Sequence, residues 1–186
     1  MYKQLILASQ SPRRRELLAM CEIPFTIVNS HVDESLNMDL PITLAVEDLA
    51  YRKAKEVAQR YPEAVVIGAD TLVIIDGEIL SKPGDASIAA DMLRKLSGKV
   101  HQVITGVSII SPTETETYSS TVDVEFYELS EDQIRKYVDS KVSLDKAGAY
   151  GIQDKGSLFI KGIVGDYYTV MGLPIARVYQ SIQKYL

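Results

Sequence analysis

The chain has 186 residues, of which 46% are hydrophobic and 24% charged, and its net charge is −5. This composition is ordinary for a soluble globular protein and excludes a disordered chain, and the acidic total argues against a general nucleic-acid coat. No run approaches the roughly 18 apolar residues that a membrane span needs, so we expect no membrane association. The length predicts a single domain over residues 1–186.

Cys21 is the only cysteine of the chain. The chain therefore cannot form an intramolecular disulfide or a Cys-rich zinc site. This cysteine usage is typical of a reducing compartment, and we expect a cytoplasmic protein.

The first predicted elements are a strand at Leu5–Ala8, which is a short apolar run, and a helix that begins after Ser11. Ser11 is a typical N-cap, and Pro12 is typical of the first helical position. The first turn then contains three arginines, Arg13 to Arg15, where the helix dipole and the unpaired N–H groups favour anions.

Two explanations of these arginines stay open on the charge pattern alone. They are three solvated side chains, or they bind an anion together with the dipole, the free N–H groups and the guanidinium forks. In either case successive helical positions point about 100° apart. We therefore expect one of the three arginines to be merely exposed.

The middle of the chain alternates strand and helix patterns. We predict a strand at 25–29, a polar loop at 31–35 and a helix from Thr43 to Arg60. The nearly continuous apolar run from Ala64 to Ile75 predicts a central strand that is covered on both faces.

The second half begins with a hairpin turn at Asp76-Gly77 and a helix that Asp85 caps and that ends at Gly98. The remaining predicted elements are a strand at 101–110, a strand at 118–126, a helix with a capping box from Ser130 to about Asp139, a strand pair at 157–163 and 167–172, and an amphipathic helix after Pro174. This mixture predicts an α/β domain built on a mostly buried sheet.

Asp70 interrupts the apolar run of the central strand. An acid at such a position is costly unless it is paired, hydrogen-bonded or bound to a metal, so Asp70 is a functional candidate; the alternative is an aspartate that caps local backbone groups. Asp33 and Glu34 offer further carboxylates, and magnesium is commonly held by one or two carboxylates together with substrate phosphates. Otherwise they belong to a solvated loop.

Two lysines complete the set of candidates. Lys53 lies beside the apolar stripe of its helix, from which its side chain can extend to solvent, and Lys82 follows the hairpin and precedes a proline. Each can also be an ordinary surface lysine. Arginines, lysines and a carboxylate-bound cation together are typical of phosphoryl chemistry.

Six segments of the chain, in this order, resemble the signature segments of the Maf family of nucleoside triphosphate pyrophosphatases, also described as septum-formation inhibitors. They extend from Leu5 to about Ala176 and read LILASQSPRRRELL, GADTLV, SKPGD, LSGKVHQVITGVSI, DKAGAYGIQ and YYTVMGLPIA. The resemblance implies an α/β fold with a mixed, twisted central sheet flanked by helices and two lobes around a cleft, related to the inosine triphosphate pyrophosphatases, and usually a homodimer. It also implies hydrolysis of a nucleoside triphosphate to the monophosphate and pyrophosphate with a divalent cation, Mg²⁺ or Mn²⁺.

The resemblance also implies roles for individual residues. Asp70 takes the proton-accepting position, and with Glu34 of the acidic loop it is our candidate for holding the cation. The remaining positions are Ser9, Arg13 and Arg14 in the phosphate-binding motif, Lys53 and Lys82 in the cationic set, and Arg13, Thr71 and Gln153 in the places associated with the dTTP- and UTP-preferring subgroup.

Several alternatives stay open beside this interpretation. Asp70 either accepts a proton from the attacking water or mainly holds the metal that acidifies it. The substrate can be a modified pyrimidine nucleotide, 7-methyl-GTP or a broad range of nucleotides. A different class of function is a nucleotide-responsive binding protein that inhibits septum formation through a cell-division partner. The segment 167–171 departs from the asparagine-containing stretch of many relatives.

Overall fold

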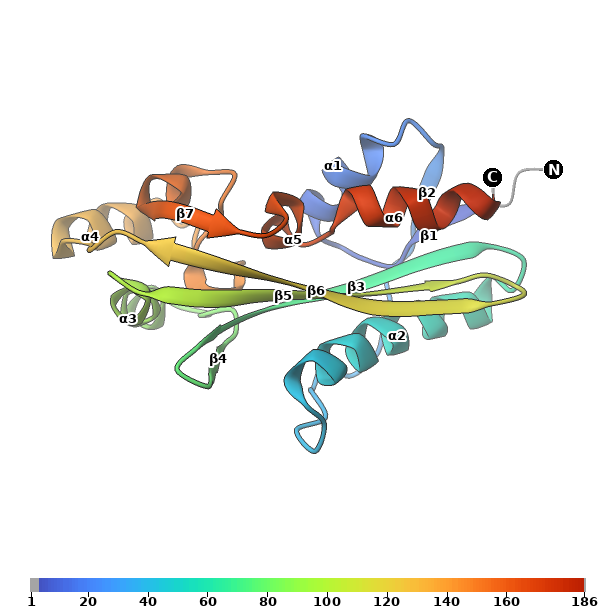
Figure 1. Ribbon diagram of the computed structural model, residues 1–186, viewed down its shortest axis with the longest axis horizontal. Helices are drawn as coiled ribbons and strands as arrows, with labels where there is room; N and C mark the ends of the chain where they lie inside the picture. Colours follow the sequence, from blue (N-terminus) through green and yellow to red (C-terminus); the bar gives the residue numbers. More distant parts are fainter. Residues whose placement is uncertain (1–3, 186) are drawn as a thin grey trace. The chain divides into compact units, whose positions relative to one another are not determined.

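The computed structural model describes residues 4–185, which form two compact units (Figure 1). Unit 1 comprises residues up to Asp70, residues 105–120 and residues from Gly172; unit 2 comprises residues 71–104 and 121–171. Three strands contribute residues to both units: β3 (Val65–Ile75), β5 (Val100–Ile110) and β6 (Thr115–Phe126). A single domain over 1–186 and a cleft between two lobes stay predictions.

The other elements each belong to one unit. Unit 1 holds β1 (Leu5–Leu7), α1 (Pro12–Ala19), β2 (Phe25–Ile27), α2 (Ile42–Arg60), α6 (Ile175–Ile182) and the 3₁₀ helix η3 (Gln183–Tyr185). Unit 2 holds β4 (Glu78–Leu80), α3 (Ala86–Leu96), α4 (Glu131–Asp139), the 3₁₀ helices η1 (Ala147–Ala149) and η2 (Lys155–Phe159), β7 (Ile160–Val164) and α5 (Tyr167–Met171).

The strands of residues 4–185 form a seven-stranded mixed sheet. Its order is β2-β1-β3-β5-β6-β7, and β4 pairs with β3. β1 runs parallel to both β2 and β3, whereas the β3–β4 and β6–β7 pairs are antiparallel. The structure thus confirms the predicted α/β class and the mixed sheet.

In unit 1, α2 and α6 lie on opposite sides of the sheet strands (Figure 1). Neighbouring residues of β6 show this alternation, because the ring of Tyr118 packs under Arg177 of α6 and the hydroxyl of Ser119 donates to Glu47 of α2. Successive side chains of a strand point to opposite faces. Both faces of this part of the sheet are therefore covered, as the apolar run predicts for the central strand.

The core of unit 2 is built around Phe126 at the end of β6, which is 2% exposed. Its ring makes edge contacts with His101, Tyr150 and Phe159, at centroid distances of 4.9, 4.8 and 6.1 Å. Such edge-to-face pairs add to the stabilisation from apolar burial. This aromatic cluster anchors the loop around Tyr150 to the sheet.

The local signals at the ends of elements are confirmed. Ser11, Asp85 and Ser130 each accept a hydrogen bond from the first turn of their helix, and Gln133 completes the capping box with Ser130. Asp76 and Gly77 both have positive φ, at 52° and 81°, as a two-residue hairpin turn requires.

The predicted strand pair at 157–163 and 167–172 is wrong in its second member. Residues 160–164 form β7, which pairs with β6, but residues 167–171 form the short helix α5. Asp166 causes the difference, since its carboxylate accepts hydrogen bonds from the backbone N–H and the hydroxyl of Thr169 at 2.7 and 2.8 Å. A helix cap of this kind outweighs the strand preference of β-branched and aromatic residues.

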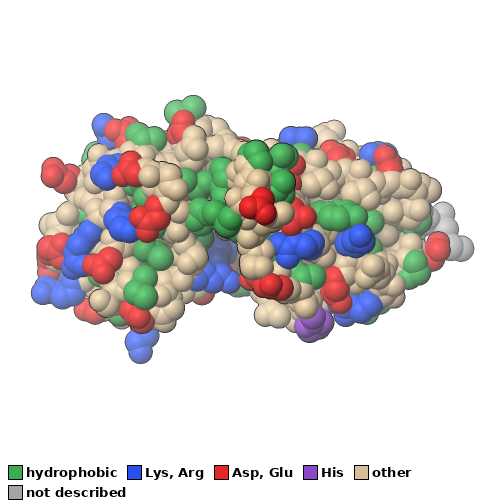
Figure 2. Space-filling view, turned by 90° about the horizontal axis from the view of Figure 1, so that it is seen from below, with side chains coloured by type: hydrophobic (Ala, Val, Ile, Leu, Met, Phe, Trp, Pro, Cys, Tyr) green, Lys and Arg blue, Asp and Glu red, His purple; other side chains and the backbone are tan. Residues whose placement is uncertain are grey.

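Basic and acidic side chains are interspersed on the face shown in Figure 2. Exposed ion pairs such as Lys95–Glu78 and Lys99–Asp76 also occur in unit 2, and each stabilises the fold only slightly. Within residues 4–185 no helix is both long enough and apolar enough to cross a membrane.

Candidate functional site

The first turn of α1 is held by two serines and by a distant carbonyl group. Ser9, which is buried, accepts hydrogen bonds from the backbone N–H of Ser11 at 3.1 Å and from Nη1 of Arg14 at 3.5 Å. Nε of Arg14 donates to the carbonyl oxygen of Gly172 at 2.7 Å. The guanidinium of Arg14 is therefore fixed from two sides at the amino end of the helix.

The three arginines of this turn differ in exposure. Arg13 and Arg14 are half-buried and Arg15 is exposed, as the 100° step between helical positions predicts. Burial lowers the pKa of Arg14, and the charge of Arg13 adds to this effect, whereas the carboxylates of Asp70 and Glu34 oppose it. Arg14 is thus electrostatically coupled to the two acids that the sequence singles out.

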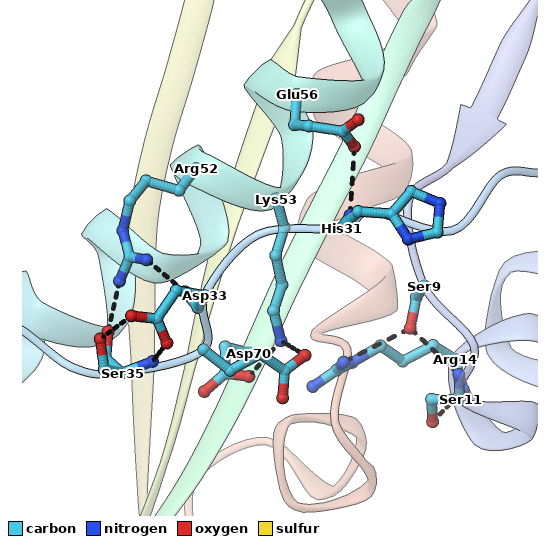
Figure 3. A network of polar contacts seen from close by, with 11 residues as sticks. Ser9, Ser11, Arg14, His31, Asp33, Ser35, Arg52, Lys53, Glu56 and Asp70 are labelled. Atoms are coloured by element: carbon cyan, nitrogen blue, oxygen red, sulfur yellow. Dashed lines mark hydrogen bonds and ion pairs between the residues drawn. The ribbon is translucent and has the colours of Figure 1, made fainter.

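Lys53 lies at the centre of the site (Figure 3). Its Nζ is 2.8 Å from Oδ1 of Asp70 on β3 and 2.9 Å from Oε1 of Glu34 in the loop before α2. The prediction that Lys53 extends to solvent is wrong, since the residue is 6% exposed. The reason is that an ammonium on a buried helix face is stabilised by the two carboxylates instead of by water.

The loop that carries Glu34 is held by Arg52, a residue that the sequence analysis did not single out. Arg52 donates to the carbonyl oxygens of Asp33 and Ser35 and to the carboxylate of Asp48. Asp33 in turn accepts from the backbone N–H and hydroxyl of Ser35, and these hydrogen bonds lower its pKa. Asp33 therefore shapes the loop locally, while Glu34 reaches Lys53.

The other candidate residues belong to unit 2. Thr71 follows Asp70 on β3 and is half-buried, Lys82 is exposed after β4, and Gln153 is exposed in a turn after η1. In unit 1 the structure brings together Ser9, Arg13, Arg14, Glu34, Lys53 and Asp70.

The turn with Gln153 is organised by its neighbour Asp154. Oδ1 of Asp154 accepts from the hydroxyl of Tyr137 at 2.9 Å and from the backbone N–H of Gly156 at 2.7 Å, and Oδ2 lies 3.5 Å from Nζ of the buried Lys146. Tyr137, Lys146 and Asp154 were not among the residues predicted from the sequence. A sequence signal for Asp154 does exist: an aspartate two residues before a glycine commonly accepts a hydrogen bond from the backbone N–H of that glycine in a turn.

The donor set around Lys53 fits a divalent cation. Carboxylates of Asp70 and Glu34 converge on one positive charge, and Mg²⁺ and Mn²⁺ prefer such oxygen donors. Among the residues that the structure describes, no cluster of three or more His, Cys, Asp and Glu side chains could hold a metal. Mg²⁺ is commonly held by one or two carboxylates together with substrate phosphates and water.

The fold has a counterpart among solved structures. The Staphylococcus aureus Ham1 protein superposes on this chain with a TM-score of 0.54 at 18% sequence identity, over 96% of this chain and 100% of the other. This likeness supports the α/β fold with a mixed sheet.

The chain also has close relatives over its whole length. The dTTP/UTP pyrophosphatase of Bacillus velezensis is 52% identical over 185 residues, which cover 100% of this chain and 98% of the relative. The dTTP/UTP pyrophosphatase of Bacillus mycoides is 49% identical over 183 residues, which cover 98% of this chain and 96% of the relative. The family described as Maf-like protein matches residues 4–185. The chain therefore belongs to the Maf family.

Proposed function

We propose that this protein hydrolyses dTTP and UTP to their monophosphates and pyrophosphate. The full-length relatives named dTTP/UTP pyrophosphatase support the substrate class. The observation that carries the chemistry is the ion pair of Lys53 with both Asp70 and Glu34, to which Arg14 is electrostatically coupled. Buried cations next to a pair of carboxylates are suited to a polyphosphate with its divalent cation.

The amino end of α1 binds the triphosphate in this proposal. The dipole at this end of the helix attracts anions, and Arg13 and Arg14 add bidentate donors. Ser9 fixes the guanidinium of Arg14, and Lys82 adds a further cation. Arg13 and Arg14, which are unfavourable next to the positive end of the helix dipole, thus become favourable when phosphate is bound.

Asp70 is the catalytic residue. A water molecule forms a bond to the α-phosphorus while the bond from this phosphorus to the bridging oxygen of the β-phosphate breaks, so that pyrophosphate leaves with the electron pair. Asp70 accepts the proton of the water, and Lys53 holds the carboxylate in place at 2.8 Å. When bound, a Mg²⁺ or Mn²⁺ ion held by Asp70 and Glu34 supplies Lewis acidity and neutralises phosphate charge.

The pyrimidine preference is assigned to Arg13, Thr71 and Gln153. An amide side chain offers both a donor and an acceptor to the edge of a base. The hydrogen bonds of Asp154 hold the turn in which Gln153 is exposed, so the amide is presented from a fixed backbone. Membership of the family further supports a cytoplasmic homodimer.

A nucleotide panel with product analysis tests the proposal. Purified protein with Mg²⁺ or Mn²⁺ should release pyrophosphate from dTTP and UTP faster than from 7-methyl-GTP, dCTP or purine nucleotides. Release of orthophosphate with a nucleoside diphosphate would refute attack at the α-phosphorus.

The matched variants are Asp70→Asn and Asp76→Asn. The first should lower kcat by at least about 100-fold with an unchanged circular dichroism spectrum. The second alters an exposed acid in a hairpin turn where asparagine fits well, and it should keep the wild-type rate. An Asp70→Asn protein with a near-normal rate would contradict the assignment.

A further inference from the structure

The backbone of α2 approaches the sheet unusually closely at two glycines. A Cβ added to Gly68 of β3 would lie 2.5 Å from the carbonyl oxygen of Ala50 and 2.7 Å from the backbone nitrogen of Ala54. A Cβ added to Gly106 of β5 would lie 2.6 Å from the carbonyl oxygen of Val46. The atoms in the way are backbone atoms of α2, so a larger residue at either position has to displace the helix.

The close approach at Gly68 coincides with the catalytic ion pair. Gly68 and Asp70 are two residues apart on β3, so they face the same side of the strand. Lys53 and Ala54 follow Ala50 by three and four residues on α2, so all three lie on one side of the helix. The contact between the two elements therefore aligns Gly68 with Ala50 and Ala54, and Asp70 with Lys53.

The ion pair leaves little room for a change in this spacing. Nζ of Lys53 lies 2.8 Å from Oδ1 of Asp70, and the lysine is 6% exposed, with Ala50 and Ala54 both at 0%. A buried lysine of this kind has few alternative rotamers that still reach a carboxylate. The distance between helix and strand is thus transmitted directly to the ammonium.

We propose that Gly68 is a positioning residue, which acts by letting α2 lie close enough to β3 for Lys53 to hold Asp70. This inference deepens the proposed pyrophosphatase activity and rests on it for its kinetic readout. Gly68 itself touches neither substrate nor metal in this role. Gly106 supports the same helix about two turns before Lys53, so its influence on the ion pair is smaller.

The experiment compares Gly68→Ala with two control variants in the full chain. Gly106→Ala makes the same kind of backbone collision at the far contact of α2, and Gly162→Ala adds a methyl group where no atom lies within 4 Å. After correction for the folded fraction, Gly68→Ala should lower kcat for dTTP about 10- to 100-fold with a smaller change in KM. Gly106→Ala should lower kcat clearly less, and Gly162→Ala should retain the wild-type values.

A double-mutant cycle separates positioning from general destabilisation. If Gly68 acts through Lys53, then adding Gly68→Ala to Lys53→Gln should cause little further loss of kcat. The combination of Gly106→Ala with Lys53→Gln should instead show nearly independent effects. Full additivity for Gly68 and Lys53 would overturn the proposal.

A second readout does not depend on activity. In ¹H–¹⁵N spectra of the side-chain ammonium groups, the Lys53 signal, assigned by its loss in Lys53→Gln, should be protected in the wild type and lose this protection in Gly68→Ala. An unchanged Lys53 signal in a folded Gly68→Ala protein would overturn the proposal. If the wild type released no pyrophosphate, the proposed function would fail while this spectrum still tested the positioning role.

A milder variant covers the case in which Gly68→Ala does not fold. Ala54→Ser adds one oxygen on the helix side of the same contact, and a helical serine hydroxyl can bond to the carbonyl four residues earlier. The same loss of kcat and of Lys53 protection, to a smaller degree, is expected. Wild-type values for both would contradict the proposal.

Discussion

Glu34 and Lys53 form a 2.9 Å ion pair in which the carboxylate side chain is 65% exposed and the ammonium side chain is only 8% exposed. Glu34 can therefore turn from the lysine to a cation at low cost, because water already reaches its carboxylate. Asp70, whose side chain is 15% exposed, is the more firmly held of the two carboxylates.

The metal requirement should depend on Glu34. Removal of divalent ions with EDTA should stop hydrolysis, and added Mg²⁺ should restore it. Glu34→Gln should raise the Mg²⁺ concentration for half-maximal rate by about 10-fold or more, because the amide is a weaker ligand than the carboxylate. Glu63→Gln, a change at another exposed acid of unit 1, is the control, and equal Mg²⁺ requirements for the two variants would refute a ligand role for Glu34.

The arginines of α1 should contribute unequally. Arg13→Ala and Arg14→Ala should each lower kcat/KM for dTTP about 10- to 100-fold, since each removes a charge-assisted hydrogen bond to phosphate. Arg15→Ala should stay within about twofold of the wild type, because this side chain is exposed. Steady-state kinetics at fixed ionic strength measure kcat/KM for the three variants. If Arg15→Ala lowered kcat/KM as much as Arg13→Ala, the distinction between half-buried and exposed arginines would be wrong.

Gln153 should influence selectivity more than rate. Gln153→Ala should lower kcat/KM for dTTP and UTP by about 10-fold relative to purine nucleotides, because hydrogen bonds to the pyrimidine edge are lost. Lys155→Ala, a change at the exposed first residue of η2, should leave the ratio unchanged. A uniform loss over all nucleotides would argue against the specificity role.

The buried His101 should make stability depend on pH. Burial lowers the pKa of His101 to about 4, so between pH 6.5 and 4 the unfolded chain binds a proton that the folded protein does not. The free energy of unfolding should therefore fall by about 3 kcal/mol as the pH drops through this window. His101→Gln should remove this part of the slope in urea unfolding curves measured at several pH values.

Tyr150→Phe provides the control for this measurement. The Tyr150 hydroxyl lies 2.8 Å from Nε2 of His101, so the variant loses this hydrogen bond but keeps the histidine buried. It should be less stable at every pH and retain the wild-type slope. A slope that vanished in Tyr150→Phe would show that the hydrogen bond, and not burial, determines the titration.

Most elements of the fold could be predicted because their signals are local. Ser11, Asp85, and Ser130 with Gln133 cap their helices as predicted, and the Asp76-Gly77 turn closes its hairpin. The helix at 167–171 could not be predicted from its own residues, which favour a strand. Its start is determined by the carboxylate of Asp166. The edge of β6 is paired with β7.

The candidate site shows a similar division. The sequence indicates Asp70 as an anomalous acid and the arginines of α1 as an anomalous cation cluster, because each contradicts its local environment. The contact of Lys53 with Asp70 and Glu34 could not be predicted from the sequence. A lysine beside an apolar stripe is usually solvated, and the distance between α2 and β3 depends on tertiary packing. The role of Arg52 in holding the loop was missed for the same reason, because its acceptors in that loop are backbone carbonyls.

The hydrogen bond from Arg14 to Gly172 joins residues that are 158 positions apart. During translation α1 leaves the ribosome early, but the carbonyl group that orients its arginine emerges only after nearly all of the sheet has been made. A nascent chain interrupted before residue 172 therefore lacks the orienting acceptor for Arg14. The arrangement around the first turn of α1 is in this sense among the last to be finished, although α1 is among the first segments to be synthesised.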